Sequence, residues 1–355
     1  VDYPFDLTGI LYFPRIKPNV ELQRNKIQLY QNQVFVTDSV EGIVPDFLTL
    51  LHGVIDSKDI PLNVSRSYLQ SDGNVKKIAG HITKKVADKL EEMFKKERES
   101  FESNWDETKI VVEYGMLTED KFNEKAKKFY LLKTTDGDFH TIEDFKVHIG
   151  KKHEDKDGKN IWLYAADIKA QHEGIQQAKA MGYEVLLMET PLSSHLIQRL
   201  EADLENVQFA RVDSDSIDQL IKKEDALPSK LSEEQEKRLK EMVEGAVEKE
   251  KFQVEVKSLS SESAPVQIVV PEFMRRMKEQ SMTGGGMMGL TDLPETYTVL
   301  VNGNHPISEK LLSEEGDSRE TLLQEVVDLA LLGQNLLHGQ ALSDFIKRHR
   351  EQLHA

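Results

Sequence analysis

Short apolar runs separated by polar turns occupy the first 60 residues of the chain. Residues 9–13, 26–30 and 34–37 are rich in Ile, Leu, Val and Phe and predict three short strands. The polar residues 31–33 join the last two, so we expect a hairpin there. Pro45 favours the start of a short helical turn, on which Phe47, Leu48 and Leu51 form an apolar stripe ending near Gly53.

A long amphipathic helix is predicted from about residue 75 to 102. Apolar residues recur there at helical spacing, with Lys and Glu on the other face. The apolar positions are Ile78, Ile82, Val86, Leu90, Met93, Phe94 and Phe101.

From residue 110 onward the pattern alternates between strands and helices. We predict strands at 110–114, 129–132, 161–164, 183–188 and 207–212, and helices at 142–149, 168–180 and 192–204. Gly182 favours a stop after the second of these helices. Strand, helix, strand, helix, strand over 161–212 indicates a small α/β unit with right-handed parallel crossovers.

The charged stretch 213–230 has few apolar residues and is typical of a linker. Ser232 and Gln235 then form a capping-box pattern, which predicts a helix that opens another domain. Strands are expected at 252–256, 266–270 and 297–301. Helices are expected at 271–280 and after Pro306, and a glycine-rich segment at 283–289.

The last predicted helices are more apolar than a lone surface helix should be. An apolar surface on nearly every side requires several neighbours, and few elements remain at this end of the chain. We therefore expect an intermolecular helix bundle, with burial inside one subunit as the alternative. The predicted dimerisation residues are Leu322, Leu323, Val326, Val327, Ala330, Leu331, Leu337, Leu342, Phe345 and Ile346.

Composition narrows the class of protein. A length of 355 residues predicts two or three domains, and no run of 18 apolar residues is present, so a membrane partner is not expected. The net charge of -16 argues against nucleic acid as a partner. The absence of cysteine excludes disulfides and thiolate chemistry, and it fits a reducing cytoplasm. The chain starts without Met or a signal sequence, so we expect a piece of a longer protein.

The segment 56–70 concentrates polar groups of defined geometry. Pro61 favours an extended entry, and Ser65 can cap a new turn on which Arg66 and Gln70 share a face, with Asn63 just before it. A guanidinium and two carboxamides suit a phosphate or a carboxylate. The alternative is a surface arginine paired with a nearby aspartate, Asp56 or Asp59.

Other candidate motifs are weaker. His172-Glu173 lacks the second histidine of a zinc helix, so no metal site is expected. Residues 155–158 resemble the opening of a calcium loop, but Ala166 stands where its glutamate belongs, which favours a charged turn. The glycines at 284–286 lack the Gly-Lys-Ser/Thr of a phosphate loop. Methionines around them suit an adaptable binding surface or, equally, a core.

Several of these segments together resemble the middle domain of the heat-shock protein 90 chaperones, and the bacterial type most of all. They are residues 11–15 (LYFPR), 27–30 (IQLY), 34–36 (VFV), 43–45 (IVP) and 53–66 (GVIDSKDIPLNVSR), followed by Leu69-Gln70. The match is specific to about residue 102, and the domain order continues to residue 355. The N-terminal ATPase domain of that family has no counterpart in these 355 residues.

The resemblance implies an α/β and α+β multidomain fold. Residues 1–105 and 106–215 would be the large and small α/β parts of a three-layer αβα middle domain. Residues 216–230 would be a linker, and 231–355 a mixed α+β domain ending in a helical dimerisation bundle.

The resemblance also implies a cytoplasmic, homodimeric chaperone that binds unfolded or partly folded client proteins. The full-length family is an ATPase that uses ATP and Mg²⁺, whereas this fragment should bind neither and show no activity alone. The family's middle-domain arginine, which contacts the ATP γ-phosphate in the missing N-terminal domain, falls on Arg66, and its neighbours fall on Asn63 and Gln70. Client contact maps onto Phe273, Met274, Met277, Met287, Met288 and Leu290.

Two rival functions are open to this chain. One is a structural dimerisation scaffold without client affinity. The other is an independent α/β enzyme built on residues 110–212, which has little support because that stretch has no glycine fingerprint, nucleophile elbow or paired acids.

Overall fold

The structure is a computed structural model, and it describes residues 5–13, 27–38, 40, 44–59, 73–223, 227–261, 263–270 and 296–352. The chain divides into two compact units. Unit 1 comprises residues 1–132 and 139–145, and unit 2 comprises residues 133–138 and 146–355. The domain boundaries expected at 105, 215 and 230 stay predictions.

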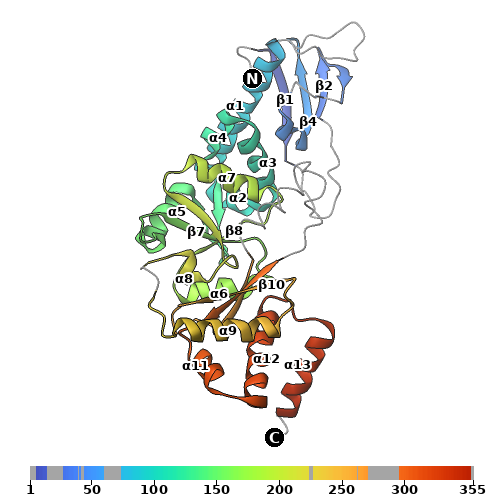
Figure 1. The fold of residues 1–355 in the computed structure, drawn as a ribbon. Coiled ribbons are helices and arrows are strands. Elements are labelled where there is room, and N and C mark those ends of the chain that lie inside the picture. Colours follow the sequence, from blue (N-terminus) through green and yellow to red (C-terminus); the bar gives the residue numbers. More distant parts are fainter. Residues whose placement is uncertain are drawn as a thin grey trace. The chain divides into compact units, whose positions relative to one another are not determined.

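Unit 1 contains a four-stranded mixed sheet. Its strands are β1 (Leu7–Tyr12), β2 (Ile27–Gln31), β3 (Val34–Thr37) and β4 (His52–Ser57), in the order β1-β4-β2-β3 (Figure 1). β4 is antiparallel to β1 and parallel to β2. The predicted β2–β3 hairpin is confirmed, and Asn32 and Gln33 form its two-residue loop with φ of 50° and 65°. Positive φ at both positions matches the twist of the paired strands.

The helices of unit 1 are η1 (Asp46–Leu50), α1 (Gly73–Lys96), α2 (Arg98–Ser103), α3 (Trp105–Thr118) and α4 (Asp120–Ala126). The predicted long helix is present, but it breaks at Glu97, whose φ of -135° lies outside the helical region. Ile78, Ile82 and Leu90 of α1 are buried, as the helical spacing predicted.

The strand predicted at 110–114 is wrong, because these residues lie in the middle of α3. The run Ile-Val-Val has a high strand propensity, which led to the error. In the structure Val111, Val112 and Met116 are buried on a helix that packs against η1 and α4. Burial at helical spacing outweighs the small intrinsic preference of β-branched residues for strands.

The boundary between the units runs through β5 (Leu131–Lys133), β6 (Phe139–Thr141) and α5 (Ile142–Ile149). Helix α5 has the predicted bounds. It is followed by η2 (Gly150–His153), and Asp155 then forms a charged turn in which its carboxylate accepts the backbone N–H groups of Asp157 and Lys159. This turn was the expected alternative to a calcium loop.

The first part of unit 2 is a three-stranded parallel sheet in the order β8-β7-β9. The elements are β7 (Asn160–Ala165), α6 (His172–Ala180), β8 (Val185–Leu187), α7 (Ser193–Asp203), β9 (Val207–Arg211) and α8 (Ile217–Leu220). The predicted parallel α/β unit is therefore confirmed, and Gly182 follows α6 with a φ of 76°. Ile217 and Ile221 join the buried core of this sheet.

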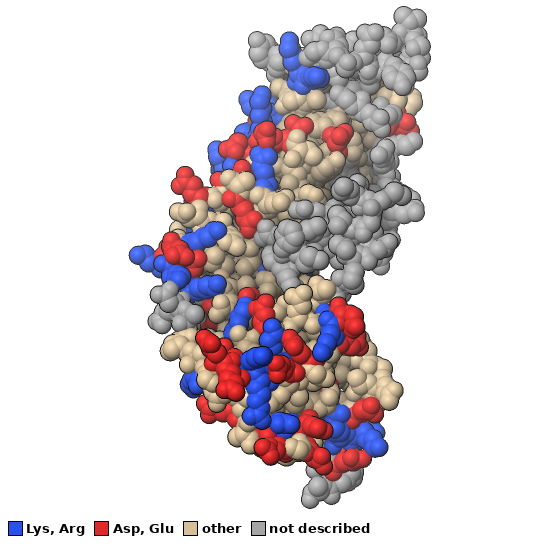
Figure 2. Space-filling model, in the orientation of Figure 1, with Lys and Arg blue, Asp and Glu red and all other residues tan. Residues whose placement is uncertain are grey.

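The second part of unit 2 is a three-stranded sheet in the order β10-β12-β11, covered by helices. The elements are α9 (Glu233–Ala246), β10 (Phe252–Lys257), β11 (Val266–Val269), β12 (Tyr297–Asn302), α11 (Pro306–Ser313), α12 (Gly316–Gly333) and α13 (Gly339–Gln352). The capping box of Ser232 and Gln235 is confirmed. Acidic and basic side chains alternate over α9 (Figure 2), as on a solvated helix.

Candidate functional site

One face of the unit 1 sheet carries large apolar side chains that are open to solvent. Ile10 of β1 lies opposite Val54 of β4, and the two are 69% and 39% exposed. Tyr12 pairs with His52 in the same register, at a ring distance of 5.5 Å. Because side chains alternate along a strand, these four residues share one face.

The opposite face of the same sheet forms core. Ile27, Leu29 and Ile55 are at most 2% exposed. The sheet therefore has one buried and one solvent-facing side, and both sides are apolar in places. On a sheet of this kind the solvent side is usually polar.

The β2–β3 hairpin extends the exposed apolar surface. Phe35 is 50% and Val34 60% exposed, and the ring of Phe35 packs edge-on against Tyr30 at 5.7 Å. Phe35 pairs with Tyr30 and so shares the face of Val54, whereas Val34 points to the other side of the hairpin. We call Ile10, Tyr12, Phe35 and Val54 the apolar sheet face. Contiguous exposed apolar groups mark surfaces that contact other macromolecules.

Sequence reasoning placed these strands but missed the apolar sheet face. The signal was present in the alternation of residues 7–12, where large apolar residues stand at both odd and even positions. A strand buried on one side needs them only at every second position. The surplus, Ile10 and Tyr12, lies on the exposed side.

The predicted phosphate-contacting residues Asn63, Arg66 and Gln70 lie outside the described residues. The structure does describe the aspartates that were the alternative partners for Arg66. The Asp56 carboxylate accepts the backbone N–H of Gln33 at 2.8 Å, and that of Asp59 accepts the N–H of Asp6 at 2.6 Å. Both carboxylates thus have a structural role in holding the sheet.

The predicted client-binding residues also lie outside the described residues. They are Phe273, Met274, Met277, Met287, Met288 and Leu290. The chain is described again from residue 296, where β12 begins almost at once.

The predicted dimerisation residues lie in α12, in α13 and, for Leu337, in the turn between them. Val326, Val327 and Leu337 are buried within this chain, the two valines at 5% and 1% exposure in the core beneath α9, β10 and β12. Leu322, Leu323, Ala330 and Leu331 pack against the same core and are half-buried. Burial inside the subunit therefore accounts for much of the apolar character of α12.

A smaller apolar set remains on the outside of these helices. Ile346 is 41% exposed, and Leu329 and Leu332, which are not among the predicted dimerisation residues, are 50% and 40% exposed. Leu329 and Leu332 stand three residues apart and share a face of α12.

A histidine in unit 2 is fixed between two strands. His153 is 1% exposed; its Nδ1 donates to the carbonyl of Ile161 at 2.8 Å, and its Nε2 accepts the N–H of Glu184 at 3.0 Å. Burial lowers the pKa of His153, although the bond to Ile161 opposes this shift. The neutral ring is thus a structural element of the α/β unit, with no feature of a catalytic group.

Among the residues that the structure describes, no helix combines the length and apolarity needed to cross a membrane. The same part of the chain holds no group of three or more side chains arranged to ligate a metal.

Fold and surface define a multidomain α/β protein that exposes apolar surface without a metal centre among its described residues. Comparison with known families identifies it further. The family model described as Hsp90 protein matches residues 1–351, and the chain belongs to this family.

The relatives are bacterial chaperones. The chain is 51% identical to "Chaperone protein HtpG" of Porphyromonas gingivalis over 329 residues, which cover 92% of this chain and 48% of that protein. It is 42% identical to the protein of the same name from Bacteroides thetaiotaomicron over an alignment of 419 positions, which covers 99% of this chain and 62% of that protein. It is 48% identical to that of Bacteroides fragilis over 318 residues, which cover 89% of this chain and 47% of that protein. The chain spans about half the length of most of these relatives.

Proposed function

We propose that this chain is the part of a chaperone that binds apolar stretches of unfolded or partly folded client proteins and dimerises through its C-terminal helices. Membership of the Hsp90 family and relatives named as chaperones support this role. The observation that carries the proposal is the apolar sheet face, where Ile10 and Val54 lie side by side and exposed.

The physical basis is the burial of apolar area on both partners. Non-native proteins expose side chains that a folded protein hides, and covering them yields about 25 cal/mol for each Å² removed from water. A sheet face without a deep pocket selects for apolar character more than for shape, which suits many clients. Contact over a small area also gives weak, reversible binding.

The test measures how well the purified chain suppresses aggregation of an unfolding protein, by light scattering. Replacing Ile10 and Phe35 by Ser should raise the concentration needed for half-suppression about fivefold, since each loses much of its apolar contact area. Val147→Ser is the control, because Val147 is 81% exposed but belongs to α5 and is not part of the apolar sheet face. Unchanged suppression in the double variant would favour the scaffold alternative, which has no client affinity.

For the full-length protein we infer that Arg66, with Asn63 and Gln70, contacts the γ-phosphate of ATP held with Mg²⁺ by a domain outside this chain. A cation supplied across a domain boundary can stabilise the transferring phosphoryl group only after the domains close. Membership of the Hsp90 family supports this role. We place the protein in the cytoplasm.

Two measurements test the arginine. Arg66→Ala in the full-length protein should lower ATP turnover with little change in nucleotide affinity. Normal turnover in that variant would refute the phosphate contact. The present chain alone should show no ATP turnover.

A further inference from the structure

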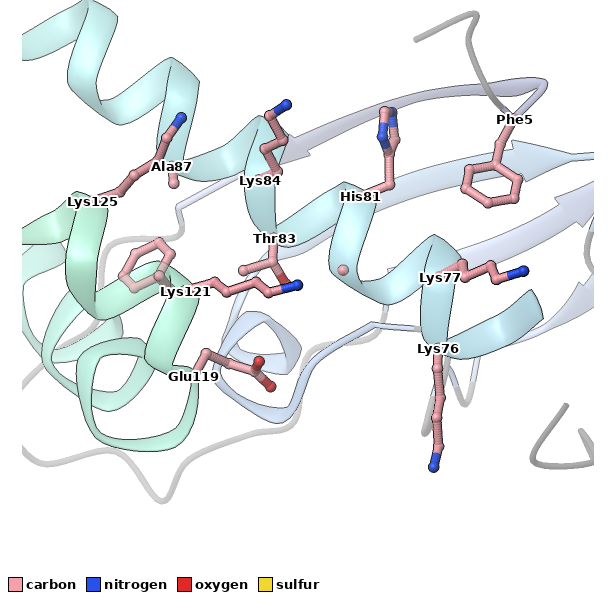
Figure 3. Close-up of a pocket in the computed structure, with 12 residues that line it drawn as sticks. Phe5, Lys76, Lys77, His81, Thr83, Lys84, Ala87, Glu119, Lys121 and Lys125 are labelled. Carbon is pink, nitrogen blue, oxygen red and sulfur yellow. The ribbon is translucent and has the colours of Figure 1, made fainter. Parts of the chain in front are cut away.

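A cavity of about 680 Å³ lies in unit 1 and is lined mainly by α1 and α4. This volume falls within the range of sites that hold small molecules, roughly 300–1,000 Å³. Figure 3 shows Lys121 extending from α4 toward α1, where Thr83 lies. The cavity is separate from the apolar sheet face, with which it shares no residue.

The lining is strongly basic in an acidic protein. Among the described residues that line the cavity, five are lysines and one is acidic, Glu119, whereas the whole chain has a net charge of -16. The lysines are Lys76, Lys77, Lys84, Lys121 and Lys125. Asp88 pairs with Lys125, yet burial, followed by repulsion from Lys84 and Lys128, lowers the pKa of Lys125. An anion in the cavity would relieve this repulsion.

The inner wall of the cavity is apolar. Phe122 and Ala87 are each 1% exposed and contribute to the lining. A ligand that reached this wall would bury an aromatic or aliphatic group there. The cavity therefore joins an apolar wall to cationic side chains, a combination that suits an amphiphilic anion.

Gly80 keeps one wall of the cavity open. It lies in the interior of α1, where glycine is about 1 kcal/mol less favourable than alanine. Packing does not require it, because a Cβ added at Gly80 would meet no atom within 4 Å. The absence of a side chain leaves space in the cavity at the cost of some helix stability.

His81 provides a polar atom that needs a partner. Its Nε2 is buried and has no hydrogen-bond partner in the part of the chain that the structure describes, while its ring packs edge-on against Phe5 at 5.9 Å. A buried polar atom without a partner costs about 1–3 kcal/mol. His81 lines the cavity, so a hydroxyl or acidic group of a ligand that reached this nitrogen would remove that cost.

We propose that the cavity between α1 and α4 binds a small amphiphilic anion, with a carboxylate or phosphate ester on an aromatic or aliphatic body. The head group contacts Lys121, which extends toward Thr83 (Figure 3), and the body lies on Phe122 in the space left by Gly80. Lys84 adds positive charge from another part of the lining. This ligand site goes beyond client binding and does not depend on it.

The probe is phenyl phosphate, titrated into the purified chain by calorimetry at low salt. Phenol and inorganic phosphate, which each carry half of its chemistry, should bind at least about tenfold more weakly. Lys84→Gln with Lys121→Gln should weaken phenyl phosphate about tenfold. Lys89→Gln with Lys96→Gln, the same charge change on exposed α1 positions outside the cavity, should leave binding unchanged.

Variants at Gly80 test the location independently of charge. Gly80→Leu should abolish binding by filling the space, whereas Gly80→Ala should retain it, and circular dichroism verifies that both are folded. No binding of phenyl phosphate, equal binding by the Lys84/Lys121 variant, or undiminished binding by a folded Gly80→Leu variant would each overturn the proposal. Inorganic phosphate binding as tightly as phenyl phosphate would also overturn it, since the apolar wall would then have no role.

Discussion

Arg348 of α13 donates a hydrogen bond to the carboxylate of Asp328 in α12, twenty residues earlier in the chain. The Asp328 side chain is only 3% exposed, and its other oxygen accepts from Gln324 at 2.8 Å. A second pair, His349 with Glu325 at 2.8 Å, lies alongside. Helix α13 is therefore attached to α12 by polar pairs as well as by the buried ring of Phe345.

We expect Arg348→Met to destabilise the chain by about 2–3 kcal/mol. The substitution keeps the apolar stem but leaves a buried carboxylate without its cation, which costs more than the pair itself contributes. Urea unfolding measures the effect. Arg350→Met, an exposed change on the same helix, should stay within about 0.5 kcal/mol of the parent. Equal stability of the two variants would mean that Asp328 does not depend on Arg348.

The helices α12 and α13 were predictable from the sequence, but the link between them was not. The leucines at helical spacing predicted α12, and Gly339 marked the break before the second amphipathic run, which is α13. A contact between residues 328 and 348 depends on how the chain turns between two helices, and no local pattern encodes that geometry. Burial of α12 was expected on nearly every side, but within this chain α9 and β11 cover only part of it, and Leu329 and Leu332 are exposed. The intermolecular bundle stays a prediction.

The free energy of unfolding should fall as the pH drops below about 6.5, because the pKa of His153 is lower in the folded chain than in the unfolded chain. Its pKa in the folded chain is lowered, so the unfolded chain binds a proton near pH 6.5 while the folded chain resists it. The unfolded state then binds more protons, and stability rises with pH across this range. In the neutral ring, Nε2 accepts a hydrogen bond from the backbone N–H of Glu184. Protonation of Nε2 would place two hydrogens opposite each other and remove this bond.

The measurement for His153 compares urea unfolding at pH 7.5 and pH 5. A single histidine contributes at most about 1.4 kcal/mol per pH unit. His153→Gln removes the titrating group, so the stability of this variant should change less between the two pH values. An equal change in both proteins would assign the pH dependence to other groups.

Gly115→Ala should destabilise unit 1, although alanine favours helices. A Cβ at Gly115 of α3 would stand 2.7 Å from the Phe47 ring and 2.8 Å from the Phe122 ring, whose centroids are 4.7 Å apart. Crowding of this kind costs about 1–3 kcal/mol, which exceeds the helical gain of about 1 kcal/mol.

The matched control is Gly80→Ala in α1, where a Cβ meets no atom within 4 Å. It should stabilise the chain by up to about 1 kcal/mol. The same chemical change thus has opposite expected signs at two helical glycines. Stabilisation by Gly115→Ala would show that the two phenylalanines can move apart freely.

The local sequence pattern predicted most helices and strands of this fold correctly. It was wrong where contacts with distant residues determine the structure. The parallel sheet β8-β7-β9 and the capping box at Ser232 depend on signals within a few residues. The strand predicted at 110–114 is wrong because η1 and α4 bury Val111 and Val112 on a helix. Helix η1 lies about sixty residues earlier in the chain, and no helix was predicted where α4 lies. The lysine-lined cavity was equally hidden, since α1 and α4 are about forty residues apart.

The exposed leucines of α12 allow the proposed dimer to be separated from the stability of the subunit. Leu329 and Leu332 are 50% and 40% exposed, so replacing both by Asp should leave subunit stability within about 1 kcal/mol but convert a dimer to a monomer in sedimentation. Val326→Ala, at a position 5% exposed in the core, should instead lower stability by about 1–2 kcal/mol. It should leave dimerisation intact at temperatures where the chain is folded. Retention of the dimer in the double aspartate variant would place the interface away from this face of α12, and a monomeric parent chain would remove the dimer altogether.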